Sequence, residues 1–290
     1  MRPTRCHPVR RTALAAESWI SNPGARVLRL IILQSLVLGM LVSPSFSQTG
    51  PPARTDPLPD RPLPDRLSQI LQDWERESAR IHSFRCPFHR KQYDDVFGPN
   101  RGIPLTEDQG ELKYIKPDKG FFRITEIRRY NTATRKHELQ KDEPGEHWVC
   151  DGKNVHELDA RLKQLKVYPL PPEHQGKAIA DGPLPFLFGA EAKKLQDRYQ
   201  IQLQKENEQQ IWLHALPRWQ QDAANFESVD LILDAKKFLP YAIQVHEPGR
   251  KSRTVYVFVL EKAKINHPLD RLFFSAPRLR PGWKRVIAGR

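Results

Sequence analysis

The chain has few cysteines and lacks the short motifs that identify common catalytic and metal sites. Only three of its 290 residues are cysteine, and none forms a C-x-x-C pair. No histidines are spaced as H-x-x-x-H or H-E-x-x-H, and no G-x-S-x-G nucleophile turn occurs. We therefore expect neither a metal ion nor a cofactor, and we favour a binding protein over an enzyme.

Two alternatives to that expectation stay open. His147, His156 and His174 lie near Cys150 and Asp151 in the sequence, and a suitable strand register would bring them together as metal ligands. Catalytic triads can also be dispersed along a chain, so the lack of a local motif does not exclude catalysis.

The N-terminal residues have the pattern of an export signal. An apolar run of 13 residues, LIILQSLVLGMLV from Leu30 to Val42, follows Arg26 and Arg29 and precedes small residues up to Ser47. The run is shorter than the ~20 residues of a membrane-spanning helix. We predict a cleaved signal peptide over residues 1–47, with an uncleaved anchor as the alternative. The pair Arg10-Arg11 would suit a twin-arginine signal, but a mis-assigned start codon explains the long basic region equally well.

Export from the cytoplasm narrows the partners that the basic charge of the chain could attract. The formal charge of +13 falls to +8 without residues 1–47, and the remaining Lys and Arg are dispersed among 33 acidic residues. A nucleic-acid binder would cluster basic residues with interleaved aromatics. We expect no nucleic-acid partner; attraction to anionic lipid head groups or to an acidic protein is the alternative to a merely solvated basic surface.

The remaining chain divides into a linker and one domain. Residues 48–64, QTGPPARTDPLPDRPLP, hold six prolines and predict an extended linker. Residues 65–290 then form one domain. It opens with an amphipathic helix in which apolar residues recur every three or four positions from Leu67 to Ile81, with Asp65 placed to cap it.

The rest of the domain reads mainly as strands. Eleven segments alternate or are rich in β-branched and aromatic residues, and turn signals such as Asp151-Gly152 and Pro248-Gly249 separate several of them. They are residues 84–93, 110–115, 121–130, 146–150, 155–158, 164–168, 199–204, 210–216, 228–233, 241–247 and 254–260. With short helical pieces near residues 185–195, they predict an α+β fold: one curved antiparallel sheet of about eleven strands whose concave face is covered by helices.

Three stretches in order resemble a known family. GELKYIKPDKGFFRI, DGKNVHELDARLKQLKVYPL and LPYAIQVHEPGRKSRTVYVFVLEKAKINHPLDRLFFSAP are similar to the successive signature stretches of the LolA-like outer-membrane lipoprotein carriers. The resemblance implies an open half-barrel closed by helices over a hydrophobic cavity, located in the periplasm. It also implies a cargo of lipid or acylated lipoprotein, an inner-membrane ABC transporter as donor and an outer-membrane receptor as acceptor. We expect a monomer.

The cavity would be lined by aromatic and branched side chains of the concave face. The candidates are Leu112, Tyr114, Phe122, Ile124, Trp148, Tyr168, Phe186 and Phe188. For each of them an ordinary core position is the favoured alternative, because core and cavity look alike in sequence.

One departure from the family concerns the helical cover. The carriers have an arginine before the proline of the first stretch, bonded to the covering helices, whereas this chain has Lys116 before Pro117. Lysine lacks the planar, multidentate guanidinium, so Lys116 is either a weaker contact to the cover or a solvated turn residue. With the charged stretch from Glu126 to Glu146, this indicates a divergent member whose cargo need not be a lipoprotein.

Cys86 and Cys150 remain once Cys6 leaves with the signal peptide. An even pair in an oxidising compartment could form a disulfide; if the two lie apart, they are buried thiols.

The favoured function is a periplasmic carrier that shelters acyl chains. The alternative is a sensor or interaction module that uses the same half-barrel to bind lipid or lipoprotein and signals to a protein partner.

Overall fold

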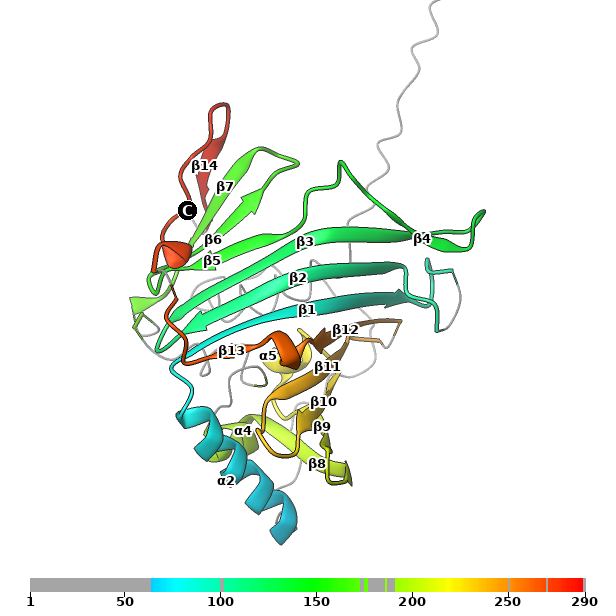
Figure 1. The fold of residues 1–290 in the computed structure, drawn as a ribbon, viewed down its shortest axis with the longest axis vertical. Coiled ribbons are helices and arrows are strands. Elements are labelled where there is room, and N and C mark those ends of the chain that lie inside the picture. The colour runs from blue at the N-terminus through cyan, green and yellow to red at the C-terminus, as the bar shows by residue number, and fades with distance from the viewer. Residues whose placement is uncertain are drawn as a thin grey trace, which may run out of the picture.

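The protein folds around one large open sheet (Figure 1). The computed structural model describes residues 64–99, 102–172, 175–176, 186, 191–249, 251–269 and 271–288. Its 14 strands follow the order β14-β7-β6-β5-β3-β2-β1-β12-β11-β10-β9-β8, with β13 paired to β1 and β4 to β3. The strands are β1 Ser83–Asp94, β2 Thr106–Ile115, β3 Lys119–Asn131, β4 Lys136–Leu139, β5 His147–Cys150, β6 Asn154–Asp159, β7 Gln164–Pro169, β8 Tyr199–Glu206, β9 Gln210–Pro217, β10 Ser228–Asp234, β11 Pro240–His246, β12 Ser252–Phe258, β13 Lys264–Ile265 and β14 Lys284–Ile287.

The predicted fold class is confirmed, and the strand count is higher than expected. Neighbouring strands pair antiparallel throughout, except β14, which lies parallel to β7. All eleven predicted strands occur, and the sequence prediction missed β4, β13 and β14. These three are two to four residues long and largely exposed, so they carry little of the apolar alternation by which a strand is recognised.

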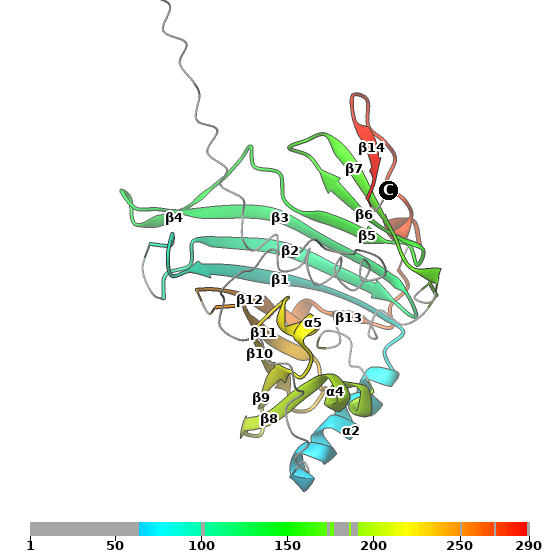
Figure 2. The same ribbon diagram turned by 180° about the vertical axis from the view of Figure 1, so that it is seen from behind.

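The structure describes three α-helices. They are α2 Asp65–Ala79, α4 Ala192–Arg198 and α5 Gln220–Ala223. Figure 2 shows α2 and α4 side by side next to the β8–β10 part of the sheet. The expected cap by Asp65 is wrong: Pro64 takes the extended N-cap conformation, and Asp65 is the first helical residue. There its carboxylate still lies favourably at the positive end of the helix dipole.

Strand alternation divides the sheet into two faces. On β1 the even-numbered residues Phe84, Cys86 and Phe88 are buried, whereas their odd-numbered neighbours are more exposed. These residues belong to a single core that also takes in the apolar side of α2, namely Leu67, Ile70, Leu71 and Trp74. The core therefore fills the concave face, between the sheet and α2.

The convex face carries a smaller apolar cluster. After β12 the chain passes through the 3-10 helices η3 Leu260–Lys262 and η4 Arg271–Phe274. Phe274 packs against Phe121 and Val149 on the outside of the sheet. The ammonium of Lys113 lies 4.3 Å from the ring centroid of Phe121 and 3.6 Å from that of Phe273. This C-terminal segment thus covers residues of the central strands from outside.

In the described part of the chain, no helix has both the length and the apolar character needed to cross a membrane. The predicted signal peptide and all but the last residue of the predicted linker lie outside the described residues.

Candidate functional site

The predicted lining residues meet on the concave face. Leu112 of β2 lies opposite Phe122 of β3, and Phe122 lies opposite Trp148 of β5, which gives a row across three strands. Tyr114 and Ile124 are buried in the same core, and the Tyr168 ring stacks on Trp148 with centroids 6.1 Å apart. Phe186 is also part of this core, whereas Phe188 lies outside the described residues. The structure thus settles which strand parity faces inward, a point that the sequence leaves open.

We name two halves of this concave face by their side chains. The apolar half comprises Phe84, Phe88, Leu112, Tyr114, Phe122 and Trp148. The polar half comprises Arg90, Gln92, Thr106, Asp108 and Glu146, on the same strands or next to them.

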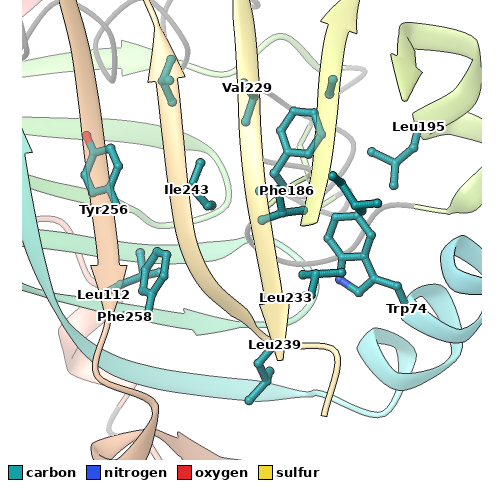
Figure 3. Close-up of a cluster of buried hydrophobic side chains, with 14 of the residues drawn as sticks. Trp74, Leu112, Phe186, Leu195, Val229, Leu233, Leu239, Ile243, Tyr256 and Phe258 are labelled. Atoms are coloured by element: carbon teal, nitrogen blue, oxygen red, sulfur yellow. The ribbon is translucent and has the colours of Figure 1, made fainter. Parts of the chain in front are cut away.

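Helix α2 covers one end of the apolar half. Figure 3 shows Trp74 of α2 pointing towards Leu233 and Phe186. A small cavity of about 10 Å³ remains where α2 meets the sheet, lined by Trp74, Ser78, Ile81, Phe84, Tyr114, Phe238, Leu239 and Pro240. That volume is about enough for one water molecule. At this junction the cover is closed onto the sheet.

The C-terminal end of α2 is held by Lys116. The Lys116 ammonium donates to the carbonyl of Ser78 at 3.0 Å and to that of Ala79 at 2.9 Å. Partial burial lowers the pKa of Lys116. Carbonyls of the last helical turn lack partners within the helix, so a cation there satisfies them and complements the helix dipole. Lys116, flagged from the sequence, therefore contacts the cover through a single ammonium rather than a guanidinium fork.

Other polar contacts of α2 lie elsewhere along its length. Near its N-terminus, Arg66 donates from Nε to a carboxylate oxygen of Glu206 on β8 at 2.9 Å. One turn before the C-terminal end, Glu75 accepts from the backbone N–H of Ala192 at the start of α4, at 3.1 Å. The helix thus reaches from the edge strand β8 to the turn between β2 and β3.

A buried ion-pair network forms the centre of the polar half. The Arg90 side chain is 1% exposed and bonds Asp108 Oδ2 through Nε at 2.8 Å and Glu146 Oε1 through Nη1 at 2.7 Å. Burial would lower the pKa of Arg90, but Glu146 and Asp108 outweigh that and raise it. Burial also raises the pKa of Asp108 against the attraction of Arg90. Arg90 is a permanent cation held between two carboxylates.

The network continues to Gln92 through a hydroxyl. Thr106 Oγ1 donates to Gln92 Oε1 at 2.8 Å and lies 3.5 Å from Asp108 Oδ2. Three buried atoms of the polar half have no hydrogen-bond partner among the described residues: Gln92 Nε2, Asp108 Oδ1 and Glu146 Oε2. The Tyr256 hydroxyl lies beside this network, and burial raises its pKa to about 12.

Gly110 marks the border between the two halves. It pairs with Phe88 across β1 and β2, and a Cβ at this position would come within 2.4 Å of the Phe88 ring and 2.6 Å of the Arg123 carbonyl oxygen. Only a glycine lets the Phe88 ring lie flat here and stack on Phe122, with centroids 5.1 Å apart. The glycine that opens the first signature stretch is therefore a packing requirement.

The structure has Cys86 and Cys150 as free thiols, so the disulfide that the sequence left open does not form here. They lie on β1 and β5, separated by β3 and β2 in the sheet. Three strand spacings amount to roughly 14 Å, well beyond the ~7 Å limit between bridged Cα atoms. Burial raises the pKa of Cys86 to about 12 and that of Cys150 to about 11. Both thiols are therefore expected to stay protonated, the less reactive form, at neutral pH.

Two of the three flagged histidines have separate roles. His156 Nε2 lies 2.8 Å from Asp151 Oδ2, whereas His147 packs its ring against Phe121. Burial lowers the pKa of His147 to about 4. His174 lies outside the described residues. Within the described ranges, no three His, Cys, Asp or Glu side chains are grouped so as to hold a metal ion.

Sequence reasoning missed the polar half of the concave face. The predicted second strand began at Gly110, whereas β2 begins at Thr106, so Asp108 had no assigned face. A usable signal was present on β1, where the alternation of Phe84, Cys86 and Phe88 continues without a break into Arg90. A charged residue in the inward phase of a strand predicts a buried ion pair.

Comparison with known proteins finds a likeness in structure alone. No protein-family model matches the chain, and no curated protein matches it. The chain is similar in structure to LolA superfamily proteins at low sequence identity. One such protein, from Nitrosomonas europaea, is 12% identical, with coverage of 72% of this chain and 97% of that chain and a TM-score of 0.33.

Two further solved structures match. An uncharacterised conserved protein from Thermus thermophilus is 10% identical, with coverage of 76% of this chain and 99% of that chain and a TM-score of 0.43. The structure of the MucA/MucB complex of Pseudomonas aeruginosa is 13% identical, with coverage of 72% of this chain and 61% of that chain and a TM-score of 0.37. Because these identities and scores are low, function has to be argued from the side chains of this chain.

Proposed function

We propose that this protein is a periplasmic carrier that shelters an acyl chain of a lipid or lipoprotein on the apolar half of its concave face, beneath α2. The observation that carries the proposal is a row of inward-facing apolar side chains across β2, β3 and β5, within a core that α2 helps to close. Each methylene removed from water on such a surface is worth ~0.8 kcal/mol.

Admission of a chain requires α2 to move. The helix packs on the sheet through side chains, and its ends are tied by Arg66 to Glu206 and by Lys116 to Ser78 and Ala79. Contacts of this kind, unlike the hydrogen-bonded ladder of a strand, can be exchanged without unpairing the sheet. In this proposal α2 is a cover that closes on an empty protein and is displaced by cargo.

Location and partners are part of the same proposal. An export signal over residues 1–47 would deliver the protein to the periplasm, and its cleavage would leave the domain free to diffuse, with residues 48–64 as an extended N-terminal segment. A carrier then needs a donor and an acceptor, for which an inner-membrane ABC transporter and an outer-membrane receptor are the candidates. The ordered resemblance of three sequence stretches to the LolA-like carriers supports this assignment.

The test is binding of fatty acids of increasing length to the purified protein, expressed from the full chain. Displacement of a fluorescent fatty acid by C10, C12 and C14 acids should show a gain in affinity of about tenfold with each lengthening, because every added pair of methylenes is buried. Native mass spectrometry of protein recovered from periplasm should show co-purified acylated species. Absence of both fatty-acid binding and co-purified cargo would refute the proposal.

A variant pair localises the binding surface. Leu112→Gln puts an amide into the apolar half and should weaken C14 binding about tenfold. Leu162→Gln makes the same exchange at a side chain that is 60% exposed and should leave binding unchanged. Circular dichroism establishes whether each variant is folded. Equal affinities in two folded variants would place the acyl chain elsewhere.

A further inference from the structure

The polar half of the concave face contains more hydrogen-bonding capacity than the described residues use. Asp108 Oδ1, Glu146 Oε2 and Gln92 Nε2 are enclosed and have no partner in the described part of the chain. The side chains of Asp108 and Gln92 are themselves almost fully buried. Enclosed polar atoms without a partner are uncommon and call for an explanation.

The three side chains are held in place by their other atoms. Asp108 Oδ2 and Glu146 Oε1 are fixed by Arg90, and Gln92 Oε1 is fixed by Thr106. Each residue therefore keeps one atom bonded within the network and one atom open. A preorganised set of this kind costs little ordering entropy when a ligand binds.

We propose that the polar half binds the hydroxyl groups of a polyhydroxylated head group, a sugar or a glycerol, on an amphiphile whose chain lies on the apolar half. This inference rests on the proposed function and deepens it by naming the cargo's head group. Two carboxylate oxygens accept and one amide nitrogen donates. A vicinal diol meets that demand, because each hydroxyl both donates and accepts.

Other head groups fit less well. A quaternary ammonium has no N–H or O–H to donate, and a primary ammonium cannot accept the hydrogen bond from Gln92 Nε2. A phosphate or carboxylate would bring further acceptors towards Asp108 and Glu146, which are acceptors themselves when ionised. The single guanidinium, Arg90, is already committed to those two carboxylates.

The two halves lie at a suitable distance for one amphiphile. Phe88 and Arg90 are two residues apart on the same face of β1, a step of about 7 Å. Tyr256 stands at the border, with its ring centroid 5.8 Å from that of Phe88 and its hydroxyl beside Arg90. A chain packed on Phe88 would carry its head group directly onto the network.

The experiment compares head groups on one chain. Dodecyl glucoside and dodecyltrimethylammonium, each below its micelle concentration, compete with a fluorescent fatty acid on protein expressed from the full chain. We expect the glucoside to displace the probe at about a tenfold lower concentration, since it gains hydrogen bonds that the ammonium cannot make. Free glucose is the third competitor and should not displace the probe at the concentrations at which the glucoside does.

A variant pair assigns the preference to the network. Gln92→Met removes the open donor with little change of shape and should lower the affinity for the glucoside about fivefold, leaving that for the ammonium unchanged. Gln109→Met, on the exposed side of β2, makes the same exchange and should change neither affinity. If Gln92→Met does not fold, the comparison of the glucoside with the ammonium on the unaltered protein still tests whether a hydroxylated head group is preferred.

Each contrary outcome has a distinct meaning. Equal displacement by the glucoside and the ammonium overturns the head-group inference and leaves acyl binding standing, with ordered water as the occupant of the polar half. Displacement by free glucose as strong as by the glucoside overturns the assignment to an amphiphile. Failure of the fluorescent fatty acid to bind, together with the absence of co-purified acylated cargo, refutes the proposed function instead.

Discussion

The two halves of the concave face are built from the same strands and differ in what their buried side chains contact. On the apolar half, Phe88 stacks on Phe122 and lies against Phe258, so that apolar atoms meet apolar atoms. On the polar half, Arg90 is fully paired but three neighbouring polar atoms are open. The apolar half stabilises the fold, whereas the polar half costs stability that only a ligand or water would return.

Replacement of Arg90, at the centre of the polar half, should cause the largest loss of stability. Arg90→Met keeps an unbranched side chain but leaves Asp108 and Glu146 buried without their cation, and loss of one partner of a buried pair costs about 3–5 kcal/mol. Chemical denaturation measures the loss of unfolding free energy. Arg85→Met removes a half-exposed arginine that pairs with Glu111, and it should cost under about 1 kcal/mol.

The cost of Arg90→Met should depend on pH with a defined sign. Burial already raises the pKa of Asp108 with Arg90 present, and loss of the guanidinium raises it further. The folded variant then binds more protons than the unfolded chain above about pH 4, so its stability falls as the pH rises. The difference from the unaltered protein should be larger at pH 7 than at pH 4.5. A cost that does not change with pH would mean that Asp108 and Glu146 are solvated in the variant.

The sequence predicts the apolar half far better than the polar half. Leu112, Phe122 and Trp148 lie in segments whose alternation already indicates strands, and their inward direction follows once the register is known. Glu146 precedes β5 and reaches Arg90 from the far side of β2 and β3. Such a contact depends on sheet order, which no local pattern contains.

For the cover, helix α2, the sequence likewise predicts the helix but not its position on the sheet. The amphipathic period of α2 identifies the helix and its buried residues, because one helix face repeats every three to four positions. Its position across the sheet involves contacts between residues far apart in the chain, such as Arg66 with Glu206, which are 140 residues apart. Family resemblance pointed to Lys116, but no pattern in the sequence gives its acceptors.

The border glycine offers a smaller perturbation of both halves. Gly110→Ala would force the Phe88 ring away from the new methyl group and press that group against the Arg123 carbonyl, at an expected cost of about 1–3 kcal/mol. Thermal unfolding measures the loss. The double variant with Phe88→Leu should recover part of it, because the smaller side chain leaves room for the methyl group. Strictly additive losses would show that the Phe88 ring does not lie over Gly110.

The smallest effect on stability, and the most local, is expected at Lys116. Lys116→Met removes the ammonium that bonds the Ser78 and Ala79 carbonyls, at a cost of about 1 kcal/mol. Because these contacts hold the cover rather than the sheet, amide hydrogen exchange should rise in α2 well before it rises in β2 and β3.

Lys91→Met is the matched control for Lys116, since its ammonium lies 3.3 Å from Glu107 on the exposed side of β1 and touches no part of the cover. It should leave exchange in α2 unchanged.

Lys116→Arg keeps a cation at the helix end and should restore most of the protection that Lys116→Met loses, since a guanidinium can also reach two carbonyls. Exchange that rises equally in α2 and in the sheet would mean that the cover and the apolar half open only as one unit, so that cargo could not enter by displacing α2 alone.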